Sequence, residues 1–174
     1  GLVWDNDFTS PITENTVITA TLTAIYSVSE NTITGLTDYG KSLTVLNIPS
    51  VIDGKSVTSI GYEAFRDCIG LTSIAIPDSV TSIGAYAFYN TVWYNNQPDG
   101  LVYAGKVAYM YKGEMPSNTS IVLKEGTLGI AGSAFFNRTE LTSVTIGNGV
   151  TSISEDAFFH CTGLTSVTIP DSVT

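Results

Sequence analysis

Few side chains in this sequence could do acid–base, nucleophilic or metal chemistry. His160 is the single histidine and precedes Cys161, one of two cysteines. A Cys–His nucleophilic pair needs the two side chains within hydrogen-bond distance, whereas neighbouring residues on an extended segment point apart. A zinc site needs three or four ligands, and no further soft ligand lies near this pair in the sequence. We therefore expect no catalytic residue, no metal and no cofactor at this position.

The composition argues against two classes of partner. The 174 residues include 7 Lys and Arg against 16 Asp and Glu, a formal net charge of −9. Nucleic acids and anionic membrane surfaces attract clustered cations, which this chain lacks. No run of 18 apolar residues could cross a bilayer. Polarity comes instead from 24 threonines and 18 serines. We expect no nucleic-acid partner and no membrane insertion.

An internal repeat organises most of the chain. The segment LTSIAIPDSVTSIGAYAF at 71–88 returns as LTSVTIGNGVTSISEDAF at 141–158 and as LTSVTIPDSVT at 164–174. The interval between Leu141 and Leu164 is 23 residues, and the Ala-Phe pairs recur at the same interval. Residues 118–140 form a degenerate copy, and residues 43–70 a copy with five extra residues around Asp53-Gly54, which suits a tight turn. Such tandem copies indicate a stacked architecture.

One copy shows how a coil is built. Leu71, Ile74 and Ile76 form the pattern of a strand, and Val80 with Ile83 that of a second, shorter one. The Ala-Phe pair then predicts a short turn, or one turn of 3₁₀ helix. A single copy buries too little apolar surface to offset the entropy of ordering its backbone, so copies must stack. The sequence therefore predicts a mostly β solenoid with short strands and short helical turns.

Glu155-Asp156 resembles a catalytic carboxylate pair, but the repeat gives it another explanation. The matching positions of the other copies carry Tyr62-Glu63, Ala85-Tyr86 and Gly132-Ser133. A solvated turn accounts for all of them. No Ser/His/Asp arrangement or phosphate-binding glycine motif is present. We predict that the protein is not an enzyme.

The repeated motifs resemble the BspA-type leucine-rich repeat. They are Leu-Thr-Ser-Ile/Val-x-Ile-Pro, then Val-Thr-Ser-Ile-Gly, then Ala-Phe followed by Cys or Thr, over roughly residues 30–174. The resemblance implies a right-handed leucine-rich-repeat solenoid. It also implies a bacterial surface or secreted protein that binds other macromolecules, for example in adhesion. Residues 4–22 also resemble, weakly, the end of a Listeria–Bacteroides-type β repeat, and ordinary Thr-rich strand chemistry explains them equally.

Two regions depart from the repeat. Residues 1–42 are expected to form an N-terminal β cap or the end of a preceding domain, with a strand over 16–26 and a hairpin partner at 32–34. Residues 94–117 have nearly the length of one coil, so we expect a β-hairpin that replaces a coil; a looped-out excursion is the alternative. The expected solenoid spans 43–174, in coils 43–70, 71–93, 94–117, 118–140 and 141–163 and a half coil 164–174.

The two ends carry further expectations. The chain stops halfway through a unit, so we expect the array to continue, or its exposed end to pack against another molecule, including end-to-end contact with a second copy. No N-terminal signal segment is recognisable. An extracellular or cell-surface location is expected from the family resemblance.

The two cysteines test the stacking. Cys68 and Cys161 each lie three residues after their Phe and are 93 residues apart, four periods plus one. With strands about 4.8 Å apart, the two would be separated by about 19 Å, far beyond the roughly 7 Å between Cα atoms that a disulfide allows. We expect two reduced thiols.

Two candidate ligand surfaces remain. The first is an uncharged stripe between the inward strand positions, expected on the concave face; a Ser/Thr ladder chosen for strand propensity is the other explanation. The second is an aromatic segment, whose residues could instead pack inside a hairpin, with Trp93 and Tyr94 the exceptions. The stripe comprises Val45, Asn47, Ser73, Ala75, Ser120, Val122, Ser143, Thr145, Ser166 and Thr168, and the aromatic segment Trp93, Tyr94, Tyr103, Tyr109 and Tyr111.

Three functions are consistent with these features. The first is a non-catalytic interaction module that binds a protein or glycan ligand. The second is a structural stalk or spacer of a larger surface protein. The third, a carbohydrate-binding accessory domain, needs acidic residues beside aromatic ones, and only Asp99 and Glu114 lie near the tyrosines.

Overall fold

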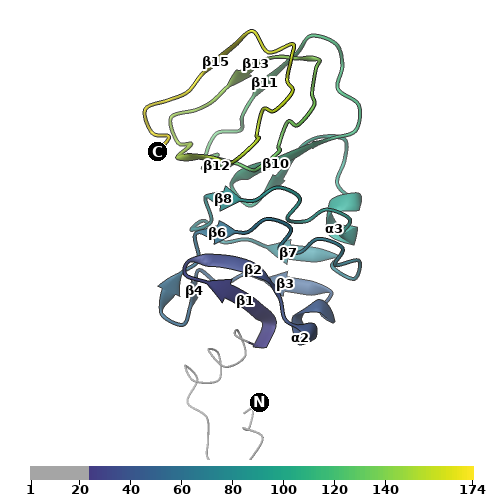
Figure 1. The fold of residues 1–174 in the computed structure, drawn as a ribbon, viewed down its shortest axis with the longest axis vertical. Helices are drawn as coiled ribbons and strands as arrows, with labels where there is room; N and C mark the ends of the chain where they lie inside the picture. Colours follow the sequence, from purple (N-terminus) through teal and green to yellow (C-terminus); the bar gives the residue numbers. More distant parts are fainter. Residues whose placement is uncertain (1–23) are drawn as a thin grey trace, which may run out of the picture.

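The computed structural model describes residues 24–174, which form a stack of coils along the long axis of the molecule (Figure 1). Each regular coil contributes one short strand to each of two parallel ladders. The solenoid expected from the repeat is confirmed. The elements are β1 (Tyr26–Ser29), β2 (Thr32–Leu36), α2 (Asp38–Lys41), β3 (Val45–Asn47), β4 (Val51–Ile52), β5 (Lys55–Ser56), β6 (Ser59–Ile60), β7 (Ser73–Ala75), β8 (Ser82–Ile83), α3 (Val92–Asn95), β9 (Gly100–Ala104), β10 (Val107–Lys112), β11 (Thr119–Val122), β12 (Gly129–Ile130), β13 (Leu141–Thr145), β14 (Ser152–Ile153) and β15 (Ser166–Thr168).

The first ladder is formed by the Leu-Thr-Ser-Ile strands and is divided. β3 pairs with β7 in one sheet, and β11, β13 and β15 form a second sheet. Pairing is parallel and keeps the period of the sequence, as in Ser143 opposite Ser166. Because side chains alternate along a strand, Leu46 and Val144 point into the core while their neighbours face solvent.

The second ladder is formed by the Val-Thr-Ser-Ile strands. β2, β6 and β8 pair in parallel, as do β10, β12 and β14. The two groups also meet, because the backbone N–H of Gly132 donates to the carbonyl oxygen of Ile83 at 2.9 Å. Ile60, Ile83 and Ile130 are 0–1% exposed and carry this side of the core.

A turn segment follows each second strand. Its hydrogen bonds have the i→i+3 spacing of a 3₁₀ helix, but left-handed residues interrupt the helix, as at Glu63 and Asp67 with φ of 53° and 57°. The same two places are left-handed in every regular coil. In return, the Phe65 N–H donates to the Ala87 carbonyl of the next coil at 2.8 Å, and the rings of Phe65 and Phe88 stack at 5.3 Å. This continuous ladder offsets the cost of left-handed non-glycine residues.

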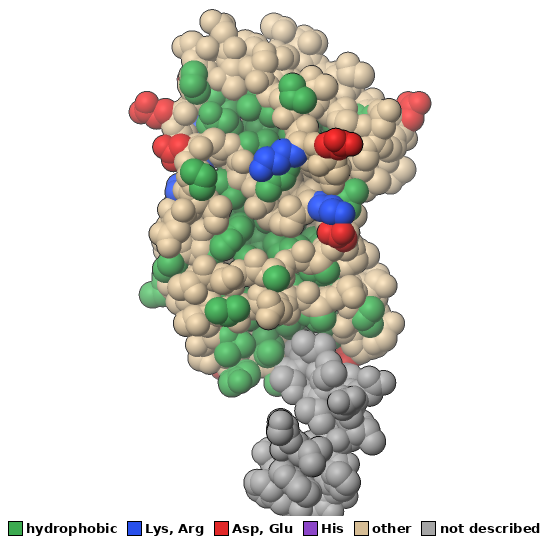
Figure 2. All heavy atoms as spheres, turned by 180° about the vertical axis from the view of Figure 1, so that it is seen from behind, with side chains coloured by type: hydrophobic (Ala, Val, Ile, Leu, Met, Phe, Trp, Pro, Cys, Tyr) green, Lys and Arg blue, Asp and Glu red, His purple; other side chains and the backbone are tan. Residues whose placement is uncertain are grey.

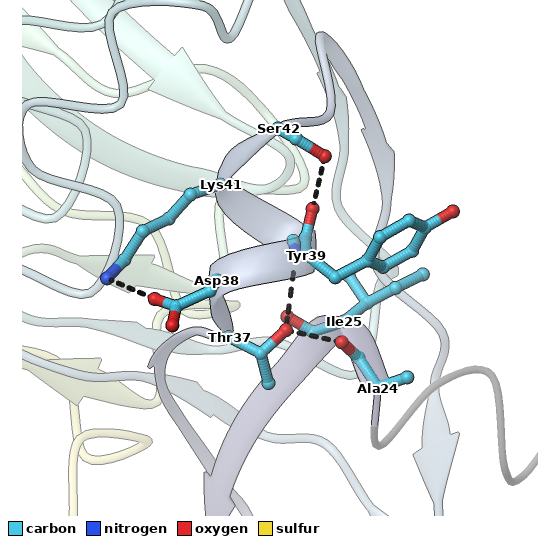
Figure 3. Close-up of polar contacts among 8 residues, drawn as sticks. Ala24, Ile25, Thr37, Asp38, Tyr39, Lys41 and Ser42 are labelled. Atoms are coloured by element: carbon cyan, nitrogen blue, oxygen red, sulfur yellow. Dashed lines mark hydrogen bonds and ion pairs between the residues drawn. The ribbon is translucent and has the colours of Figure 1, made fainter.

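The described N-terminal part caps the first coil. β1 and β2 form an antiparallel hairpin through Glu30-Asn31, and β2 pairs with β6. The expected strand over 16–26 lies mostly outside the described residues, and the strand that pairs begins at Tyr26. Thr37 ties this hairpin to α2: its hydroxyl donates to the Ala24 carbonyl and accepts from the Gly40 N–H at 3.1 Å (Figure 3).

A β-hairpin occupies the place of one coil. After α3, β9 and β10 pair antiparallel, and β10 continues into the second ladder by pairing with β12. The hairpin separates two hydrophobic clusters, and β10 contributes to both. Val107 and Tyr109 pack into the N-terminal cluster, whereas Ala108 and Tyr111 pack into the C-terminal one. The strand therefore joins two cores that would otherwise be separate.

Tyr109 and Tyr111 replace the backbone contacts of the missing coil. The Phe88 N–H, which would meet the next Ala carbonyl, donates to the Tyr109 hydroxyl at 2.8 Å. On the other side, the Tyr111 N–H donates to the Ala134 carbonyl at 2.8 Å, as a repeat Phe would. The buried ladder is thus satisfied across the hairpin.

The strand-linking turns predict a stabilising substitution. Val80, Val150 and Val173 each donate their N–H to the carbonyl three residues earlier, which belongs to Pro77, Gly147 or Pro170. Gly147→Pro should raise the free energy of unfolding by about 0.4–1 kcal/mol, because proline already fits the same turn in two coils and restricts the unfolded chain. Urea unfolding tests this. Gly126→Pro should destabilise instead, because its φ of +79° is closed to proline. A destabilised Gly147→Pro variant would contradict the equivalence of the turns.

Candidate ligand-binding groove

An open groove of about 530 Å³ follows the second ladder. Its floor consists of small residues, because neighbouring backbones approach closely there. A Cβ at Gly132 would lie 2.6 Å from the Ala85 nitrogen, and one at Gly84 would overlap the Tyr62 backbone. The floor is therefore flat and lined by hydroxyl and backbone groups. The lining residues are Thr32, Ser59, Ile60, Gly61, Tyr62, Ser82, Gly84, Ala85, Tyr86, Gly132, Ser133, Phe136, Ser154, Glu155 and Asp156.

A second groove of about 230 Å³ continues the first toward the hairpin. The two share Tyr86, Ser133 and Phe136, so they lie next to each other, and we call the two grooves together the path. The second groove is mainly aromatic. It is lined by Tyr86, Tyr89, Tyr94, Met110, Tyr111, Lys112, Gly113, Ser133, Ala134, Phe136 and Arg138.

The ends of the path differ in charge. Lys112 and Arg138 line the hairpin end, whereas Glu155 and Asp156 line the larger groove. On the face shown in Figure 2, uncharged side chains cover most of the described surface, and charged ones are few and scattered. The lining residues show that a ligand in the path would meet mainly rings, hydroxyls and backbone, with cations at the hairpin end and two carboxylates in the larger groove.

The predicted aromatic residues lie mostly inside the protein. Tyr94, Tyr109 and Tyr111 are buried, and Trp93 and Tyr103 are half-buried. The expected exposure of Tyr94 is wrong: Thr91 caps α3 and turns the Tyr94 ring inward, 5.7 Å from that of Tyr109. Of the five residues, Tyr94 and Tyr111 line the smaller groove, and the other three line neither groove.

The expected single inward face of the hairpin is also wrong. The register shifts between Ala108 and Met110, and β10 is packed on both sides. Val107 and Tyr109 therefore face one core, whereas Leu101 and Tyr103 pack against the other.

The predicted uncharged stripe is largely exposed but lies away from the grooves. Val122 is 75% exposed, yet no stripe residue lines either groove. The two grooves follow the second ladder and the hairpin, and the concave position of the stripe stays a prediction. Hydroxyls on these strands bond between coils, as Ser143 does with Ser120 at 2.9 Å and Thr142 with the Thr119 carbonyl. These bonds favour the structural explanation, while ligand binding by the stripe stays a prediction.

Sequence reasoning missed Tyr62, Tyr86, Tyr89 and Phe136, which line the path. Tyr86 replaces Glu63, Ser133 and Asp156 of other coils, and Tyr89 stands where the first coil has Arg66. An aromatic residue at a turn position that is polar in the other coils is the signal that could have found Tyr86, whereas the position of Tyr89 and Phe136 is also aromatic at Phe159 and gives no such signal.

His160 and the two cysteines, which were considered first for catalysis and metal binding, lie in turn segments and have structural roles. His160 is left-handed, with φ of 57°, and its exposed ring lies 4.3 Å from that of Phe159. The Cys161 thiol donates to the Phe135 carbonyl at 3.0 Å. Both cysteines are free, as their spacing predicts, and burial raises the pKa of each thiol, which disfavours a reactive thiolate. Within residues 24–174 no cluster of three metal-ligating side chains occurs.

Comparison with known proteins agrees with the observed coils. A family model described as the BspA-type leucine-rich repeat region matches residues 38–110 and 105–174, with six copies. The chain belongs to the BspA-type leucine-rich repeat family. No curated protein matches this BspA-type chain. In the described part of the chain, no helix has the length and apolar character needed to cross a membrane.

Three solved structures resemble this BspA-type chain. A leucine-rich repeat protein of T. pallidum has 21% identity and a TM-score of 0.40, over 86% of this chain and 81% of that one. One from Bacteroides ovatus has 29% identity and a TM-score of 0.36, over 85% and 40%. A leucine-rich cell surface protein from Faecalibacterium prausnitzii has 26% identity and a TM-score of 0.36, over 86% and 41%. The chain thus spans about 40% of the latter two.

Proposed function

We propose that this BspA-type segment is a non-catalytic interaction module of a surface or secreted protein, and that it binds a macromolecular ligand along the path formed by the two grooves. The observation that supports this proposal is that the two grooves adjoin at Tyr86, Ser133 and Phe136. The path passes residues of four regular coils and of the hairpin, and it is bordered by partly exposed rings. Rings at the border of a cleft are effective anchors for a ligand.

Tyr86 offers the most direct test, because it lines both grooves. Tyr86→Ser should weaken binding of any ligand found by screening extracellular-matrix proteins and glycans, by about tenfold or more, which is common for an aromatic anchor. Serine already occupies the equivalent left-handed position 133, so the fold should persist. Affinities can be measured by biolayer interferometry.

Two control variants sharpen the Tyr86 test. Tyr39→Ser removes a ring that is 58% exposed and outside both grooves, and Val122→Thr alters the stripe. Both should bind as the wild type does. If binding is lost in Val122→Thr and kept in Tyr86→Ser, the stripe is the binding surface and the proposed path is wrong.

A spacer is the second candidate function. The inter-coil hydroxyl bonds on the strands of the stripe favour it, because the bond between Ser143 and Ser120 gives these two stripe residues a structural role, and Thr142 and Thr165 beside the stripe form similar bonds. Absence of binding across the whole screen would support the spacer and overturn the interaction module.

A further inference from the structure

Two half-buried cations stand at the hairpin end of the path without an acidic partner. Lys112 Nζ donates to the carbonyls of Asn95, at 2.6 Å, and Gln97. Arg138 donates through Nη1 to the Gly113 carbonyl at 2.8 Å and through Nη2 to the Tyr111 carbonyl at 2.6 Å. Neither cation takes part in an ion pair among residues 24–174.

The nearby carboxylate of Asp99 forms no ion pair with either cation. Asp99 lies against Gly113, since a Cβ there would overlap the Asp99 carboxylate, but it forms no ion pair with Lys112 or Arg138 within 4.0 Å. The carbonyl bonds hold both cations in position and leave each without an ion-pair partner among residues 24–174. Charge that is fixed in advance lowers the entropic cost of binding an anion.

Aromatic rings surround these charges. Lys112 Nζ lies 5.9 Å from the Tyr94 ring centre, and the Arg138 guanidinium carbon 5.1 Å from that of Tyr111. The volume here, about 230 Å³, is below the roughly 300–1,000 Å³ of a pocket for a drug-sized ligand. It suits one ring-sized unit carrying a negative group, with the rest of a polymer continuing past Tyr86 toward Tyr62, whose ring lies 6.5 Å from that of Tyr86, and away from Glu155 and Asp156.

The floor of that larger groove favours a sugar polymer over a peptide. Extended peptides commonly add to a free sheet edge, but β6 and β12 are each paired on both sides and the coil of β12 bonds to the outer side of β8, which leaves β14 as the groove strand at the end of its sheet among the described residues. The floor offers the hydroxyl of Ser59 and that of Ser82, which also bonds the Ser154 hydroxyl at 3.2 Å, beside the partly exposed rings of Tyr86 and Phe136. Hydroxyl groups and apolar ring faces are the two surfaces of a pyranose.

We infer that the hairpin end of the path binds the carboxylate of a uronic-acid unit in an acidic polysaccharide, with Lys112 and Arg138 as the anion-binding residues. The inference rests on the proposed function, since it assigns a ligand class to the same path. It predicts that the neutral counterpart of the polysaccharide binds more weakly, because only the carboxylate meets the two cations.

Calorimetry with oligogalacturonate tests the inference, with a neutral galactan oligomer and a poly-glutamate peptide as comparisons. Lys112→Gln should weaken oligogalacturonate binding about tenfold, the loss of one charge-assisted contact, and Lys112→Arg should retain most of it. Arg138→Thr should weaken it similarly, and threonine already occupies the equivalent position 91. Lys124→Gln is the matched control, because Lys124 also lies over a tyrosine ring, 4.4 Å from the centre of Tyr103, and lines neither groove.

Each outcome has one meaning. Selective loss in Lys112→Gln and Arg138→Thr supports the inference. No binding of oligogalacturonate, equal loss in Lys124→Gln, or preference for poly-glutamate overturns it. If oligogalacturonate fails while another ligand still depends on Tyr86, only this inference falls and the proposed function stands.

Discussion

Replacing Tyr109 by alanine should lower the free energy of unfolding by about 3–5 kcal/mol, the cost of truncating a large buried aromatic side chain. Tyr109 is 0% exposed and lies among the rings of Phe88, Trp93 and Tyr94, with centroids 5.2–6.4 Å away. The cavity would open where β10 meets the N-terminal core. Urea unfolding followed by circular dichroism measures the loss.

Tyr109→Phe isolates the hydroxyl. It should cost about 1–3 kcal/mol, because the buried Phe88 N–H would lose its acceptor. Tyr103→Phe is the matched control: its hydroxyl accepts from the Lys124 N–H at 2.9 Å in an exposed setting, so water can replace it and the cost should stay below about 1 kcal/mol. Hydrogen exchange at Phe88 should accelerate only in Tyr109→Phe. Equal stability of Tyr109→Phe and the wild type would show that this hydrogen bond does not support the fold.

Gly129→Ala should be the most damaging glycine substitution at the joint between the coils. A Cβ at Gly129 would overlap the backbone carbonyl oxygen of Thr81, and a backbone atom cannot move aside as a flexible side chain can. Overpacking of this kind costs about 1–3 kcal/mol and occasionally more, so we expect a loss of at least about 2 kcal/mol. Thermal unfolding of the variant measures it.

Gly70→Ala is the control for this substitution. Nothing lies within 4 Å of its Cβ, and its φ is outside the left-handed region. Its effect should remain within about 0.5 kcal/mol, as for most surface changes. If Gly129→Ala is as mild as Gly70→Ala, the coils of β8 and β12 do not approach as closely as described.

The repeat made the regular coils predictable. A position that recurs every 23 residues meets the same neighbours in each coil, so the inward places of Leu71 and Ile83 and the distance between the cysteines followed from spacing alone. The β1–β2 turn at Glu30-Asn31 was also visible, while most of the expected strand over 16–26 lies outside the described residues. The sequence pattern was sufficient to predict the burial of residues whose surroundings consist of the neighbouring copies of the repeat.

Interruption of the repeat is where prediction failed. Burial of β10 on both faces depends on two cores that meet only after stacking, and no period in 94–117 signals this. The exposure of Tyr94 was also predicted wrongly, because the direction of its side chain depends on the capping of α3 by Thr91. The groove was missed because its floor depends on how closely coils approach, and because Tyr86 and Phe136 belong to coils that the hairpin segment separates in the sequence but that contact each other directly at Ile83 and Gly132.

The division of the first ladder gives the stack a preferred direction of bending. The sheets β3–β7 and β11–β13–β15 share no pairing among the described residues, whereas the second ladder is bridged by the bond from Gly132 to Ile83. Under load, we expect the two halves of the stack to separate first at the first ladder, where no strand pairing joins them, and to bend about the second ladder, where the Gly132–Ile83 bond does. Because the larger groove follows the second ladder, bending would alter the curvature of its floor rather than separate the residues that form it.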